Sequence, residues 1–106
     1  MALAAYTQLD SITSDERYHA AILHAQVGQI PEALALADTM LQQRPGYLLA
    51  YVVRGVVAGF QEDTAALRAA HAAFLQHYTA EMAAKRPEYA DHANVIDDFR
   101  KQAEKK

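Results

Sequence analysis

The chain has 106 residues, a formal net charge of -3 and a sequence pI near 5.9. This length predicts a single domain, residues 1–106, with a small core. The acidic balance gives no electrostatic footprint for a polyanion, so we expect no nucleic-acid partner. The chain lacks cysteine, which excludes disulfides, thiolate metal sites and cysteine nucleophiles.

Alanine dominates the apolar part of the composition. Hydrophobic residues make up 52% of the chain, and 23 residues are alanine, which favours closely packed helices over strands. The only cluster of β-branched residues lies at positions 52 to 57, and its apolar residues keep the spacing of a helical face. The predicted fold class is therefore all-α, without strands.

The first predicted elements in chain order are a short helix over residues 2–9 and a second helix from residue 14 to about residue 27. The polar residues between them suit a break, and the Ser14 hydroxyl can cap the second helix. Asp15 and Glu16 follow at the positive end of the helix dipole, where carboxylates are favoured.

Gly28 marks the turn of a helical hairpin. Glycine takes the left-handed geometry of a helix C-cap without a Cβ clash, and Pro31 suits the first turn of the next helix. That helix spans residues 30–43, because Pro45 disfavours helical geometry in the residue before it. These residues predict an antiparallel hairpin over residues 14–46.

The rest of the chain predicts helices over residues 47 to 59 or 60, 64–85 and 87–106. Asp63 or Thr64 is available as the N-cap of the long alanine-rich helix. A second hairpin would then span residues 47–86, and the last helix, starting at Pro87, would cap the core. The apolar stripe of the last helix predicts its buried face: Tyr89, His92, Ile96 and Phe99.

A repeat of about 34 residues relates the two hairpins, since this offset carries Arg17 to Tyr51 and Ala21 to Gly55. The first hairpin resembles the tetratricopeptide family, whose repeat is a helical hairpin of about this length. The residues that match its small, turn, alanine and closing-proline positions are Ala21, Gly28, Ala33 and Pro45. The resemblance covers roughly residues 14–86.

The chain departs from the family pattern at several positions. Arg17 stands where an aromatic residue is usual, Ala20 where leucine is usual, and His24 where tyrosine is usual. In the second hairpin Arg54 takes the leucine place, and the closing proline is delayed to Pro87. We therefore expect the second helix of that hairpin to be about two turns longer than its counterpart.

The resemblance implies a short right-handed superhelix whose first helices line a concave groove for a peptide or helix of a partner protein. The residues that it places in this groove are Tyr18, Ile22, Gln26, Val52, Val56 and Phe60. They are mostly apolar, and the charged clamp with which family members hold a partner's terminal carboxylate has no counterpart among them. The groove is therefore expected to take an apolar segment.

Two other covers for the same stripe are open. Residues 2–9 can fold over it, which would make the stripe ordinary core, or a second copy of the chain can fill it. The predicted function is a non-catalytic scaffold for protein interaction. The alternative is a homo-oligomerisation or regulatory module whose groove is filled by its own N-terminal segment or by a second copy.

Five histidines are the candidates for catalysis or metal binding: His19, His24, His71, His77 and His92. The first two are five residues apart and the next two are six apart, and neither step places two ligands on one helix face. His71 and His92 lie on apolar stripes, where we expect hydrogen-bonded core histidines. No phosphate loop or nucleophile elbow is present, so we expect no enzyme activity, no cofactor and no metal.

The N-terminus lacks the basic region and the apolar run of a secretory signal, and no apolar run approaches the length of a membrane span. We therefore expect a soluble cytoplasmic protein without a membrane partner. The abrupt start and finish are equally consistent with a piece of a longer chain.

Overall fold

The computed structural model describes residues 14–105, and all regular structure in this range is helical. The helices in this range are α2 (Ser14–Gln26), α3 (Ile30–Gln43), α4 (Leu48–Phe60), α5 (Thr64–Ala83), α6 (Pro87–Asp91) and α7 (Ala93–Glu104). The predicted all-α fold class is confirmed. The helix predicted over residues 2–9 lies outside the described residues.

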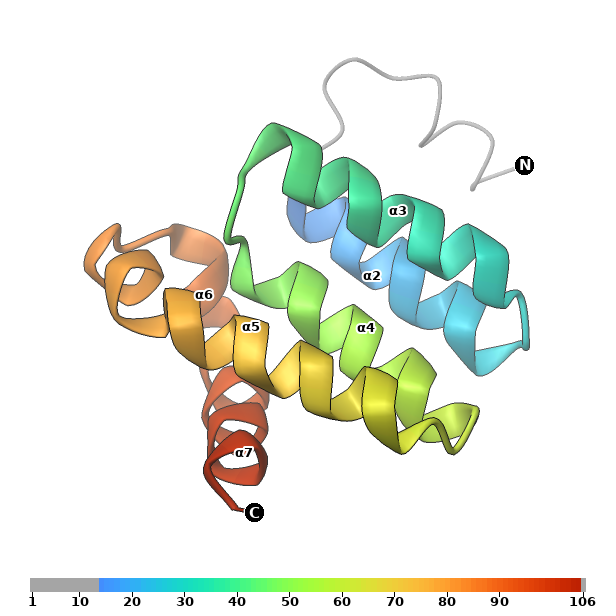
Figure 1. Cartoon of the computed structure of the whole chain (residues 1–106). Helices are drawn as coiled ribbons and strands as arrows, with labels where there is room; N and C mark the ends of the chain where they lie inside the picture. The colour runs from blue at the N-terminus through green and yellow to red at the C-terminus, as the bar shows by residue number, and fades with distance from the viewer. Residues whose placement is uncertain (1–13, 106) are drawn as a thin grey trace.

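Two helical hairpins, α2–α3 and α4–α5, form the body of the molecule (Figure 1). The first hairpin turns at Gly28, whose φ of 84° lies in the left-handed region, as predicted. The amide of Gln29 donates to the carbonyl of His24 over 2.8 Å, which closes the last turn of α2. Helix α3 then begins with Pro31 in its first turn.

Helix α5 begins at the predicted N-cap. The Asp63 side chain accepts a hydrogen bond of 3.0 Å from the amide of Ala66. Helix α5 has 20 residues and α3 has 14, which confirms that the second helix of the second hairpin is the longer one. It ends at Ala83, slightly before the predicted end, and Lys85 then takes a positive φ of 54°.

Helix α4 lies at the centre of the bundle and contacts α2, α3, α5 and α7. The buried residues in its first half are Leu48, Leu49, Ala50, Tyr51, Val52 and Val53. Alanines let the neighbouring helices come close, since Ala21, Ala33 and Ala37 have no exposed surface. The core is therefore built around α4, with small side chains at the helix crossings.

The prediction of one final helix over residues 87–106 is wrong, because the chain breaks at His92 into α6 and α7. His92 has a φ of -114° and a ψ of 28°, which interrupts the helix. The break lets Tyr89 bury beside the start of α4 and Phe99 bury between α4 and α5. Tyr89, Ile96 and Phe99 are buried as predicted, whereas His92 is half-buried.

Candidate functional site

The residues predicted to line a groove belong to α2 and α4, two helices that contact each other. Tyr18 and Val52 belong to the core, with 6% and 2% of their surfaces exposed. Ile22 and Val56 are half-buried against that core. Phe60, at the end of α4, is 57% exposed. The stripe is thus covered toward the start of the two helices and open toward their ends.

The C-terminal arm, α6 and α7, covers the closed part of the stripe. The ring centroid of His92 lies 4.9 Å from that of Tyr18 and 5.0 Å from that of His19. Farther along α4, Phe99 lies so close to Gly55 that an added Cβ would be 2.6 Å from its Cζ atom. The sequence predicted this arm as a cap but did not predict that it reaches Tyr18.

Large apolar side chains are exposed near the ends of α2 and α4. Leu23, Val27 and Phe60 expose 56%, 70% and 57% of their surfaces. Leu23 lies in the last turn of α2 and Val27 follows it, and α2 and α4 end on the same side of the molecule, at the right of Figure 1. We name these three residues, together with the half-buried Ile22 and Val56, the α2–α4 patch.

Sequence reasoning named Phe60 but missed Leu23 and Val27. Both residues lie off the apolar stripe of α2, on a face that is otherwise polar. A large apolar side chain on a polar helix face is the signal that would have found them. Gln26, which the repeat offset did name, is exposed next to Val27.

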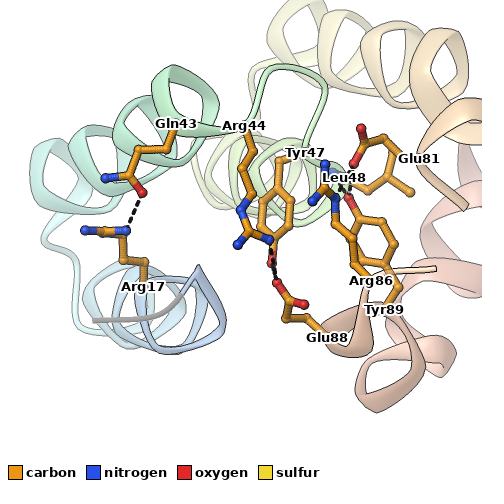
Figure 2. A network of polar contacts seen from close by, with 9 residues as sticks. All are labelled: Arg17, Gln43, Arg44, Tyr47, Leu48, Glu81, Arg86, Glu88 and Tyr89. Atoms are coloured by element: carbon orange, nitrogen blue, oxygen red, sulfur yellow. Dashed lines mark hydrogen bonds and ion pairs between the residues drawn. The ribbon is translucent and has the colours of Figure 1, made fainter. Parts of the chain in front are cut away.

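A polar cluster fastens α6 to the turn before α4 (Figure 2). The Tyr47 hydroxyl donates to Glu88 over 3.0 Å, and Arg44 pairs with the same carboxylate over 3.1 Å. Burial, followed by the nearby Glu88 carboxylate, raises the pKa of Tyr47, so the phenol stays protonated and remains a donor. One carboxylate thus holds the α3–α4 turn to α6.

The other half of this cluster joins α6 to α4 and α5. The Tyr89 hydroxyl accepts a bond of 2.9 Å from the buried Leu48 amide and donates to Glu81 over 2.6 Å. Arg86 pairs with the same Glu81 carboxylate over 2.9 Å. Burial, followed by the hydrogen bond to Glu81, raises the pKa of Tyr89. Since each carboxylate is shared by a phenol and an arginine, the arrangement fastens α6 in place.

The histidines do not converge on a metal site. Within residues 14–105, no group of three or more His, Cys, Asp or Glu side chains is placed to hold a metal ion. His24 contacts Gln29, with 2.6 Å between Nδ1 and Oε1. His77 stacks on Tyr51, with the ring centroids 5.8 Å apart. His24 and His77 thus each contact a nearby side chain of the described protein.

His71 packs edge-on against Phe99, with the ring centroids 5.0 Å apart. Its Nε2 atom is buried and has no hydrogen-bond partner in the part of the chain that the structure describes. The prediction of a hydrogen-bonded histidine is therefore wrong at this atom, and the ring packs on an aromatic neighbour instead of a polar one. Burial lowers the pKa of His71, since desolvation disfavours the imidazolium form.

No family model, curated protein or solved structure matches this chain in comparisons with known proteins. The resemblance to tetratricopeptide repeats therefore stays a prediction from the sequence. Among the described helices, none combines the length and the apolar character needed to cross a membrane. A function for the α2–α4 patch is therefore inferred from the exposure and chemistry of its residues alone.

Proposed function

We propose that this chain is a non-catalytic interaction module that binds a helix or peptide of a partner protein on the α2–α4 patch. The observation that carries the proposal is the exposure of Leu23, Val27 and Phe60, each by more than half of its surface. Burying a fully exposed side chain of this kind contributes about 1.5–3 kcal/mol before the costs of association, and the exposed 56–70% of each of these contributes a corresponding part. The proposal takes these side chains to form one apolar surface, since large exposed apolar patches mark interaction sites.

The packing of the C-terminal arm supports a helical occupant. Helix α7 lies on α4 through Phe99, which contacts Gly55 and whose ring centroid lies 4.9 Å from that of Phe74. Helix α4 continues from there to Val56 and Phe60, which line the open part. A partner helix with aliphatic or aromatic anchors at helical spacing would pack on Val56 and Phe60 of the same helix, α4.

In this proposal the two hairpins are repeats of a short right-handed superhelix similar to tetratricopeptide proteins, with α6 and α7 as its cap. The succession of two hairpins supports it, and so do the small residues Ala21 and Gly55, which are buried at equivalent positions. The proposal retains the predicted cytoplasmic location and the absence of enzyme activity. Both remain predictions from the sequence.

A charge placed on the patch tests the proposal. Phe60→Asp changes an exposed patch residue, and Met82→Asp is the matched control, because Met82 is 37% exposed on α5. We expect a partner retained by the immobilised parent chain and by Met82→Asp to be lost with Phe60→Asp, while the helical circular dichroism signal persists. Light scattering on the same samples measures the oligomeric state.

The two measurements separate the possible occupants. A dimer that dissociates only in Phe60→Asp would identify a second copy of the chain as the occupant and support the homo-oligomerisation alternative. A monomer that retains the same proteins with and without Phe60→Asp would contradict the proposal.

A further inference from the structure

A cleft that includes no residue of the α2–α4 patch lies between α5 and the end of α7. Its volume is about 420 Å³, and small-ligand pockets begin at about 300 Å³. The residues that line it are Arg68, His71, Ala72, Leu75, Ala103 and Lys105. This lining combines basic with apolar side chains and contains no carboxylate, although the chain as a whole is acidic.

Two cations of this cleft have no partner among residues 14–105. Within residues 14–105, every arginine and lysine makes a hydrogen bond or an ion pair except Arg68, Lys85 and Lys105. Two of these three line the cleft. The carboxylate next to Lys105 in the sequence, Glu104, pairs with Arg100 over 3.2 Å. The cleft therefore brings together two positive charges that no described carboxylate neutralises.

The remaining lining of the cleft is uncharged. Leu75 exposes 36% of its surface, and Ala72 and Ala103 add apolar surface from α5 and α7. Burial lowers the pKa of His71, which favours its uncharged form. The positive charge of the cleft thus comes from Arg68 and Lys105, beside an apolar wall.

We propose that this cleft binds a small organic anion, with the anionic headgroup between Arg68 and Lys105 and a short apolar body against Leu75. A guanidinium binds carboxylates and phosphates through paired hydrogen bonds, and the apolar wall removes the body of the ligand from water. A carboxylate and a phosphate monoester share this chemistry. The site is independent of the proposed interaction function, because the two share no residue.

Calorimetric titration of the full chain with hexanoate, hexyl phosphate and hexanol tests this site. We expect at least one of the two anions to bind. Hexanol has the same apolar body without the charge and should bind at least about tenfold more weakly, the ratio that one charge-assisted hydrogen bond supplies. Binding of hexanoate alone or of hexyl phosphate alone identifies the headgroup. The NMR shifts that change should be those of Ala72, Leu75 and Ala103.

Single substitutions locate the charge. Arg68→Gln and Lys105→Gln should each weaken the anion by about tenfold. Lys101→Gln is the matched control, because Lys101 is exposed on α7 and pairs with Asp97 outside the lining. Arg68 and Lys105 are themselves exposed, so the unfolding curves of all three variants should overlay that of the parent. The proposal is overturned if neither anion binds, if hexanol binds equally well, or if Arg68→Gln and Lys105→Gln leave the affinity unchanged.

Discussion

Replacing Gly55 with alanine tests how α7 packs on α4. An added Cβ would lie 2.6 Å from Cζ of Phe99 and 3.7 Å from Cδ1 of Leu67. The Phe99 ring cannot move away freely, because the ring centroids of His71 and Phe74 lie 5.0 and 4.9 Å from its own. Overpacking costs about 1–3 kcal/mol, and alanine gains about 1 kcal/mol over glycine inside a helix. Gly55→Ala should therefore range from neutral to about 2 kcal/mol destabilising.

Gly59 provides the matched control on the same helix, because it is exposed and an added Cβ would meet nothing within 4 Å. Gly59→Ala keeps the gain in helix propensity without the clash. Gly55→Ala should therefore be less stable than Gly59→Ala by about 1–3 kcal/mol. Urea unfolding followed by circular dichroism measures this difference. Equal stability of the two variants would refute the close contact of Phe99 with Gly55.

Three further predictions concern single residues. Gly28→Val should destabilise by more than about 1 kcal/mol, because a φ of 84° strains a β-branched residue most, and a chemical unfolding curve that overlays the parent's would contradict this. Ala33→Leu should cost about 1–3 kcal/mol in the same assay, since Ala33 has no exposed surface, and a neutral result would show that its site has room. The lowered pKa of His71 means that the unfolded state binds more protons as the pH falls below its usual value of 6.5. Stability should therefore decrease from pH 7 toward pH 5, and His71→Gln should reduce that slope in urea unfolding; an unchanged slope would contradict the assignment.

The helix bounds could be predicted where nearby residues set them. Pro31 and Pro45 bracket α3, whose observed range, Ile30–Gln43, equals the predicted one. Gly28 and Asp63 act at the turn and the cap as predicted. These interactions involve residues a few positions apart in the chain, so the sequence pattern displays them directly.

The break at His92 could not be predicted, because neither glycine nor proline marks it. It accompanies tertiary contacts: Tyr89 is held by the Leu48 amide and by Glu81, and Phe99 lies against Gly55. Leu48 lies 41 residues before Tyr89 in the chain. Gly55 lies at a similar distance before Phe99, so both contacts are long-range. Periodicity shows that a helix has an apolar face, but it does not show which other helix covers that face.

The candidate site could be predicted only in part, for the same reason. The repeat offset named Val56 and Phe60 on α4, and both line the open part of the stripe. It also named Tyr18, which the structure buries beside His92. Exposure at each position depends on how far the C-terminal arm reaches, and that is a property of tertiary packing.

Photocrosslinking from the α2–α4 patch tests the central claim most directly. Phe60→p-benzoylphenylalanine places a photoreactive aromatic group at a side chain that is 57% exposed, and the same substitution at Met82, 37% exposed, is the control. We predict that irradiation in cell extract joins the Phe60 variant to one protein, that the Met82 variant does not form this adduct, and that excess parent chain competes it away. If the Phe60 variant labels no protein beyond those labelled by the Met82 variant, and no second copy of the chain, the patch is not an interaction surface.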